Sequence, residues 1–304
     1  MDRVVNVLTI DVEEHFHAHA FETVIPRATW DSLPSRVGPN TRRVLRVLEE
    51  YGVHGTFFLL GWVADRHPDL VREIAAAGHE VATHGYWHEL IYRQSPEAFT
   101  ADLRRSLDAI GRALGGAQPV GYRAPSFSIT AASLWALDVL RDHGLVYDSS
   151  IFPLSAHDRY GIGDADRFAN RLRNGLWEFP ASTVRLGGRN WPVAGGGYLR
   201  LLPLSLTRRA IRRLNAEGHP AIVYLHPWEL DPEQPRVADA PLLSRFRHYV
   251  NIGRTEERLR ALLSEARFGP IREVFAHLLA APAAEVGSTP AARRAVEAGS
   301  SRRA

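Results

Sequence analysis

The chain has 304 residues, a formal net charge of +3, 45% hydrophobic and 23% charged residues, and no cysteine. This composition is typical of a globular protein and excludes disulfides, thiolate chemistry and cysteine metal sites. The charge is mild, and no basic stretch interleaved with aromatic residues points to nucleic acid. No apolar run approaches the roughly 20 residues that span a bilayer, and the N-terminal segment is too short for a secretion signal. We therefore expect a cytoplasmic protein without a membrane span.

The first half of the chain alternates strands and helices. An apolar, β-branched run at 4–10 predicts a buried strand that ends at Asp11, and a long connection follows at 12–38. The next predicted elements are, in order, a helix at 41–51, a strand at 54–60, a helix at 68–77, a strand at 80–83, a helix at 96–114 and a strand at 119–122.

The second half continues the alternation less regularly. The predicted elements are a helix at 130–143 and strands at 145–147 and 177–179, then a helix at 204–217, a strand at 221–225 and a helix at 256–266. The pattern favours a parallel sheet ringed by helices, either a β/α barrel or an open doubly wound sheet. We expect one domain at 1–280, with a distinct C-terminal part from about 150, and a disordered tail at 281–304, which is rich in Ala, Ser, Gly and Arg.

His84 and His88 follow a predicted strand and are four residues apart. On a helical or tightly turned segment this spacing points both imidazoles the same way, so they can bind one divalent metal with a carboxylate from elsewhere. A chance pair of surface histidines is the alternative. The other three polar segments that follow strands begin at Asp11, Arg123 and His226, and parallel strands bring such ends to one edge of a sheet.

The acidic segment after the first strand offers both a ligand and a base. If strand geometry continues past Asp11, Glu13 lies on the same face and Glu14 on the opposite face. Glu13 is then the expected ligand beside Asp11, and Glu14 remains an alternative ligand. A solvated acidic strand end is the non-functional interpretation. The next three histidines could also be ligands, but we expect them to lie on the surface of a loop; they are His15, His17 and His19.

Arginine and histidine end two further strands. Arg123, followed by a rigid turn at Pro125, can orient a carboxylate, although a structural salt bridge is the alternative. His226 is suited to proton transfer because its ordinary pKa lies near neutrality, and a core histidine is the alternative. Glu178 is predicted either to keep that imidazolium charged or to form a structural pair.

Four segments together, TIDVEE, HGYWH, RAPSF and YLHPWEL, resemble the motifs of the polysaccharide deacetylases with the NodB homology domain, carbohydrate esterase family 4. The resemblance covers about residues 4 to 275 and implies a distorted (β/α) barrel. Further segments are similar to the subgroup encoded beside exopolysaccharide and exosortase (PEP-CTERM) systems; they are DVEEHFH, DSSIFP, GGGYLRLLP, HPWELDP and FRHYVNIGRTE. The first motif departs from the family pattern, because Val12 stands where a second aspartate is usual. That departure, like the face argument, points to Glu13 as the ligand.

The resemblance implies a hydrolase that removes N-acetyl groups from an amino-sugar polysaccharide in exopolysaccharide biosynthesis. It assigns a role to each motif residue: Asp11 as general base, Arg123 as its partner, Glu13, His84 and His88 as ligands of a divalent metal that we expect to be zinc, and His226 as general acid. In the expected mechanism the metal polarises the amide carbonyl and acidifies a water, Asp11 takes the water proton, and His226 protonates the leaving amine.

The same hypothesis covers two further features, a donor to the oxyanion and aromatic side chains that contact the sugar. A backbone N–H near Ser126 is expected to stabilise the oxyanion, and Trp228, together with Trp87 and Trp191, could stack on sugar rings. Two alternatives remain. One is a metal-dependent hydrolase of cyclic amides similar to the allantoinase-like relatives, and the other is a non-catalytic sugar-binding protein. The sequence leaves the oligomeric state open.

Overall fold

The computed structural model describes residues 4–155, 161–193 and 195–280, so the predicted tail at 281–304 lies outside the described residues. Eleven strands lie in these residues: β1 (Asn6–Val12), β2 (Thr56–Leu59), β3 (Glu80–Thr83), β4 (Gly121–Tyr122), β5 (Tyr147–Asp148), β6 (Asn170–Arg171), β7 (Trp177–Glu178), β8 (Thr183–Leu186), β9 (Arg189–Pro192), β10 (Ile222–Leu225) and β11 (Phe268–Gly269).

The α-helices of the described residues are α1 (Val37–Glu50), α2 (Gly61–Arg66), α3 (Pro68–Ala76), α4 (Pro96–Ala113), α5 (Trp135–Asp142), α6 (Gly196–Leu201), α7 (Leu204–Ala216), α8 (Leu242–Tyr249), α9 (Thr255–Glu265), α10 (Ile271–Val274) and α11 (Ala276–Leu279). Short 3₁₀ helices occupy several connections, including η1 (His15–His17), η2 (His19–Phe21), η3 (Arg27–Ser32), η5 (Pro125–Phe127) and η7 (Pro227–Leu230).

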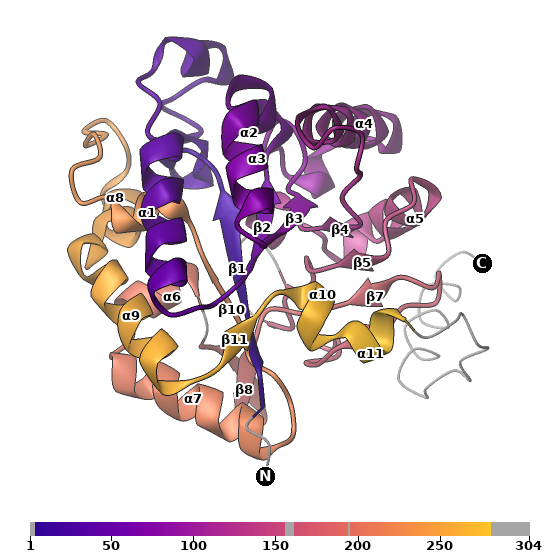
Figure 1. Ribbon diagram of the computed structural model, residues 1–304, viewed down its shortest axis with the longest axis vertical. Helices are drawn as coiled ribbons and strands as arrows, with labels where there is room; N and C mark the ends of the chain where they lie inside the picture. The colour runs from indigo at the N-terminus through magenta and orange to yellow at the C-terminus, as the bar shows by residue number, and fades with distance from the viewer. Residues whose placement is uncertain (1–3, 156–160, 194, 281–304) are drawn as a thin grey trace, which may run out of the picture.

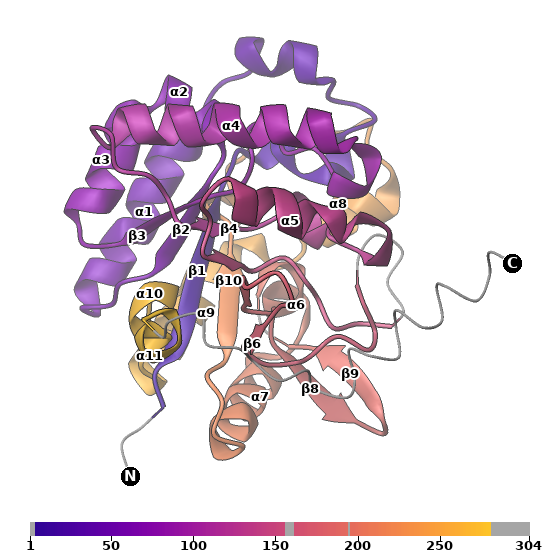
Figure 2. The same ribbon diagram turned by 90° about the vertical axis from the view of Figure 1, so that its right-hand side faces the viewer.

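Nine strands form one curled sheet in the order β10-β1-β2-β3-β4-β5-β7-β6, with β11 also paired to β1. Neighbours from β10 to β7 pair in parallel, so the strands end at the same edge. Every residue of β1 is buried because the strand lies at the centre and helices cover the sheet. Figures 1 and 2 show the helices around the sheet and the separate hairpin β8–β9 beside α7. The predicted distorted barrel is confirmed as an open half-barrel.

The predicted strands and helices are present within a few residues of their expected ends. The largest shift is at α5, which begins at Trp135 rather than 130, because a separate 3₁₀ turn at Ala131–Ser133 precedes it. Helix α1 begins at Val37 rather than 41, because the Glu14 carboxylate accepts the backbone N–H of Val37 at 3.0 Å and caps the first turn. Pattern reasoning missed α2, α6, α8 and the hairpin of β8 and β9. In the part of the chain that the structure describes, no helix has the length and apolar character needed to cross a membrane.

Candidate active site

A buried ion pair lies at the end of β1. Arg123, directly after β4, donates from Nη1 to Asp11 Oδ1 at 2.8 Å. The fully buried guanidinium also donates to Thr9 Oγ1 at 2.7 Å, and to the backbone oxygen and hydroxyl of Ser149 at 3.1 and 2.9 Å. These bonds fix the guanidinium plane, and the guanidinium in turn orients the Asp11 carboxylate. The contact predicted between Arg123 and Asp11 is therefore present.

Three side chains that could hold a metal ion converge beside this pair: Glu13, His84 and His88. One ligand atom from each lies within 4.8 Å of the others, and Glu13 Oε2 is 2.8 Å from His88 Nε2. His84 Nδ1 donates to the backbone oxygen of Arg123 at 2.7 Å, which leaves Nε2 of the neutral ring free to bind a cation. Burial lowers the pKa of His84 to about 4 and so keeps that ring neutral. Two imidazoles and one carboxylate are a donor set that fits zinc.

The turn between the two histidines is held by α4. Its Asp102 carboxylate accepts the backbone N–H of Tyr86 at 2.8 Å and of Trp87 at 3.0 Å. Gly85 has φ +74°, and a Cβ there would lie 2.9 Å from Asp102 Oδ2, so the turn has no room for a side chain. The two imidazoles are brought together by a tight turn that begins directly after β3 and is not helical. Sequence reasoning missed Asp102 because it lies on another element.

Glu13 is kept ionised by its neighbours. Burial raises the pKa of Glu13, but the nearby imidazoles of His88, His226 and His84 outweigh burial and hold the pKa well below its usual range. The other carboxylate oxygen, Oε1, accepts the indole N–H of Trp228 at 3.0 Å. Glu13 is thus fixed from two sides, with Oε2 directed toward the histidine pair.

Trp228 orients this carboxylate, and its environment argues against the predicted stacking on sugars. The indole is 5% exposed and stacks on His248 at 4.2 Å and on His226 at 5.0 Å between ring centroids. A ring already packed against two imidazoles has no free face for a sugar. Of the other two tryptophans, Trp191 is 52% exposed on β9, and Trp87 is partly buried in the turn between the histidines.

His226, directly after β10, faces the other side of the cluster. Its Nε2 is 3.9 Å from Asp11 Oδ2 and 3.7 Å from Glu13 Oε1, while its Nδ1 is 3.4 Å from Glu229 Oε2. Burial alone would lower the pKa of His226, but Glu13, Glu229 and Asp11 together raise it to about 9. The imidazole is therefore a proton donor near neutral pH.

Glu229, which sequence reasoning missed, links His226 to a buried arginine. Its Oε2 accepts the His226 backbone N–H at 3.0 Å, and its Oε1 accepts from Arg200 Nε at 2.7 Å. Burial raises the pKa of Glu229, but Arg200 and His226 lower it to about 2. Arg200 is anchored in turn by backbone oxygens of α8 and the residues after it, including that of Arg247 at 3.1 Å. The i,i+3 spacing at the start of η7 was the signal that could have identified this carboxylate.

Glu178 does not lie beside His226. Glu229 is instead the carboxylate that helps to keep the imidazolium of His226 charged. Glu178 sits opposite Asp148 in the pairing of β5 with β7, and its Oε1 accepts the backbone N–H of Ile151 at 3.0 Å. Burial raises the pKa of both carboxyl groups, that of Asp148 to about 6 and that of Glu178 further above its usual range. This pair is the structural alternative that the sequence left open.

The Glu14 side chain turns away from the predicted metal cluster, and the neighbouring histidines pack behind it. The Glu14 carboxylate accepts from Ser35 Oγ at 2.6 Å and from the backbone of Arg36 at 2.9 Å, so it holds the start of α1. His15 and His17 are buried, which makes the expected surface position wrong for both. The reason is that the connection folds inward, where the His17 ring packs on Trp30 at 4.3 Å.

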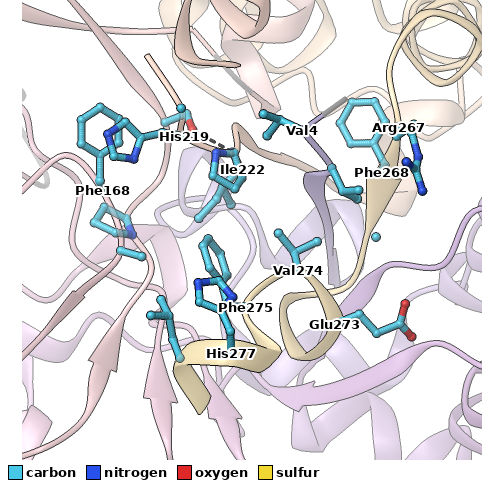
Figure 3. A pocket seen from close by; sticks show the side chains of 18 of the residues that line it. Val4, Phe168, His219, Ile222, Arg267, Phe268, Glu273, Val274, Phe275 and His277 are labelled. Carbon is cyan, nitrogen blue, oxygen red and sulfur yellow. Dashed lines mark hydrogen bonds between the residues drawn. The ribbon is translucent and has the colours of Figure 1, made fainter. Parts of the chain in front are cut away.

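Two of the cavities in the described residues differ in character. The first, of about 200 Å³, is lined by Asp11, the metal-binding cluster, Ser126 and His226. The second, of about 630 Å³, lies at the opposite end, where β10 and β11 begin. Figure 3 shows that His219 and Phe168 lie on one side of the second cavity and Arg267 and Glu273 on the other. No predicted catalytic or metal-binding residue lines the larger cavity, so its size does not indicate the site.

A family model described as polysaccharide deacetylase matches residues 27–147. This stretch of the chain is similar to the polysaccharide deacetylases. A second model, a domain of unknown function (DUF3473), matches residues 149–276. The two matched stretches share one sheet, since Tyr147 of β5 pairs with Trp177 of β7.

Curated proteins named as deacetylases match parts of the chain. A chitooligosaccharide deacetylase of Rhizobium leguminosarum bv. trifolii is 42% identical over 76 residues, 24% of this chain and 35% of the relative. One from Bradyrhizobium sp. (strain ANU 289) is 36% identical over 106 residues, 34% and 46% of the two chains. A peptidoglycan deacetylase of Helicobacter pylori is 32% identical over 114 residues, 36% of each. The chain thus spans less than half the length of each of these relatives.

A crystal structure of a Mycobacterium smegmatis protein assigned to the polysaccharide deacetylases has the same fold. It matches with a TM-score of 0.60 and 22% identity, covering 94% of this chain and 95% of that chain. The likeness therefore extends through both matched stretches and supports the half-barrel architecture.

Proposed function

We propose that the protein is a metal-dependent deacetylase that hydrolyses N-acetyl groups of an amino-sugar polymer. The observation that carries the proposal is the convergence of Asp11, the cluster of Glu13, His84 and His88, and His226 in one cavity of about 200 Å³. A base, a cation site and an acid are the parts that amide hydrolysis needs. The relatives named as chitooligosaccharide and peptidoglycan deacetylases support an N-acetylated sugar as the substrate.

In this proposal Glu13, His84 and His88 hold the metal, for which zinc is our choice. When bound, a divalent cation supplies Lewis-acid chemistry, which polarises an acyl carbonyl and makes water acidic enough to attack near neutral pH. Asp11, oriented by Arg123, accepts the water proton at Oδ2, the oxygen that Arg123 leaves free. The backbone N–H of Ser126, which lines the cavity in a turn with φ +52°, is the proposed donor to the oxyanion.

His226 is the proposed general acid. Its Nε2 faces Asp11 and Glu13, and its raised pKa of about 9 keeps a proton available for the leaving amine. Glu229 lies behind the imidazole of His226 and is bound in turn by Arg200. Both side chains are buried, and they fix the orientation of the ring. The proposed proton acceptor, Asp11 Oδ2, and the proposed proton donor, His226 Nε2, are 3.9 Å apart in one cavity.

We further propose that the polymer is an exopolysaccharide. The support is the set of segments that resemble the exopolysaccharide-associated subgroup, four of which contribute to the site: DVEEHFH, GGGYLRLLP, HPWELDP and FRHYVNIGRTE. HPWELDP contains His226, Trp228 and Glu229, and FRHYVNIGRTE contributes Arg247 and His248 to the cavity wall.

Acetate release from a panel of N-acetylated oligosaccharides tests the proposal. The protein is stripped with a chelator and assayed before and after zinc is restored, with a cyclic ureide as the competing substrate. We expect acetate from the amino-sugar oligomers only after zinc is returned. Hydrolysis of the ureide alone would make the protein a cyclic-amide hydrolase, and binding of sugar without acetate would make it a non-catalytic binding protein.

A further inference from the structure

Helix α8 turns its apolar side chains outward and its polar ones inward. Leu242, Leu243 and Phe246 are 79%, 60% and 57% exposed. The inward face is formed by His248 and Tyr249, whose rings pack on Phe21 at 4.5 and 6.0 Å between centroids. A surface helix normally buries its apolar face. Three large apolar side chains on one exposed turn therefore suggest that something covers them.

The same surface carries arginines without acidic partners. Within the residues that the structure describes, no carboxylate lies within 4.0 Å of the guanidinium groups of Arg236, Arg245 and Arg247. Some exposed arginines elsewhere are paired, as Arg42 is with Glu73 at 2.7 Å and Arg112 is with Asp65 at 2.7 Å, so what distinguishes this surface is the position of its arginines beside exposed apolar side chains. The helix itself contains no acidic residue. Unpaired cations around an apolar tip are typical of helices that lie in a membrane interface.

We propose that α8 docks the protein onto a membrane surface with anionic lipid headgroups. Leu242, Leu243 and Phe246 would enter the acyl boundary, and the three arginines would contact lipid phosphates. A second copy of the chain is a poorer occupant, because a stable protein interface buries about 800 Å² on each partner and three side chains offer only a part of that. Charge argues the same way, since two copies of this surface would bring like charges together.

Docking through α8 would bring the catalytic cavity close to the lipid. Arg247 and His248 of α8 line that cavity together with Asp11 and His226. In Figure 1, α8 lies at the upper left, at the end toward which β1 runs. The proposal does not depend on the reaction itself, because it rests on exposure and charge. It adds that the substrate is encountered at a membrane.

Co-sedimentation of the full chain with extruded vesicles tests the inference. Vesicles of phosphatidylcholine with phosphatidylglycerol are compared with phosphatidylcholine alone, at low and high salt. We expect binding to the anionic vesicles, weakened by salt because headgroup attraction is screened. The double variant Leu242→Ser with Phe246→Ser should partition at least about tenfold more weakly. Arg236→Gln with Arg245→Gln should reduce binding to anionic vesicles and lose its salt dependence.

Leu206→Ser is the matched control, because Leu206 is 50% exposed on α7 and away from the arginines of α8. It should bind vesicles as the wild type does. All substituted side chains are exposed, and circular dichroism checks that each variant is folded. Absence of binding to anionic vesicles, or equal loss in the Leu206 control, overturns the proposal. So does a concentration-dependent dimer, measured by light scattering without lipid, that the double serine variant abolishes, since α8 would then be a self-association surface.

Discussion

Partner side chains and burial shift the pKa of buried groups differently at the two ends of the sheet. Where the strands end, burial is outweighed by partners: the pKa of Glu229 is lowered to about 2 and that of His226 raised to about 9. Where β3 begins, burial prevails: the pKa of His79 is lowered to about 4 and that of Glu80 is raised. Glu229 and His226 are thus kept charged where the strands end, although burial prevails there for His84, Asp148 and Glu178. His79 and Glu80, at the other end, are pushed toward their neutral forms. The larger cavity, of about 630 Å³, lies where the strands begin.

This difference locates chemistry better than cavity size does. Keeping charged groups inside a protein costs stability unless each has an oriented partner, so a chain of such partners marks a place where charge is needed. The chain from Arg200 through Glu229 to His226, and the pair of Arg123 with Asp11, have this form. The lining of the cavity in Figure 3 mixes polar side chains, including Arg267 and Glu273, with apolar ones.

The most damaging single change should be Glu13→Gln. The substitution keeps the size of the side chain but removes the carboxylate that completes the set with His84 and His88. Loss of a residue that hydrogen-bonds a metal ligand typically weakens metal affinity by roughly 10- to 100-fold. Glu13 is itself a proposed ligand, so we expect zinc affinity to fall by more than that and acetate release to fall with it. Zinc content after dialysis, measured by mass spectrometry, checks this. Glu14→Gln is the matched control and should keep its zinc, because Glu14 caps α1; loss of zinc in the Glu14 variant alone would reverse the ligand assignment.

His226→Asn should lower kcat by about 10²- to 10⁴-fold, because general acid catalysis typically contributes that much. His219→Asn, at the wall of the cavity where the strands begin, should leave kcat unchanged. Steady-state acetate release with zinc-loaded proteins compares them. The contrast between the two ends would fail if the His219 variant lost as much activity as the His226 variant.

Trp228→Phe should have a smaller effect. The phenyl ring can keep the stacking on His248, but it cannot donate to Glu13 Oε1. Loss of this hydrogen bond to a proposed metal ligand should weaken zinc binding by about 10- to 100-fold and leave stability close to that of the wild type. Competition with a chromogenic chelator measures the affinity. Wild-type zinc affinity in this variant would show that the indole only packs.

Most of the fold could be predicted because strands and helices alternate with clear periods. The ligand choice also followed from a local rule, since side chains alternate along a strand and Glu13 therefore shares a face with Asp11. Both facts depend on short-range geometry. The motif residues converge because each directly follows one of several parallel strands whose ends share an edge.

The outer contacts of the site could not be predicted, because they depend on how separate elements are placed. Asp102 reaches the turn of Tyr86 from α4, and no spacing in the sequence sets the register between them. The burial of His17 depends on how the connection folds onto Trp30. Glu229, rather than Glu178, lies beside His226 because of the 3₁₀ turn after β10. The sequence predicted neither the type nor the direction of that turn.

The smallest effect on activity should come from His79→Asn, at the end where β3 begins. In the folded protein His79 accepts the backbone N–H of Gly55 at Nδ1, at 3.1 Å, and its pKa of about 4 lies below the ordinary 6.5. Between these pH values the unfolded chain binds a proton that the folded protein does not. Stability is therefore lost as pH falls from about 6.5 to about 4, by about 3 kcal/mol in total. Asparagine keeps an acceptor but cannot titrate, so the variant should lose this part of the pH dependence. Urea unfolding at several pH values measures the slopes, with exposed His277→Asn as the control that should keep the wild-type slope. Activity near neutral pH should not change, and an unaltered slope in the His79 variant would mean that burial at this end does not hold the imidazole neutral.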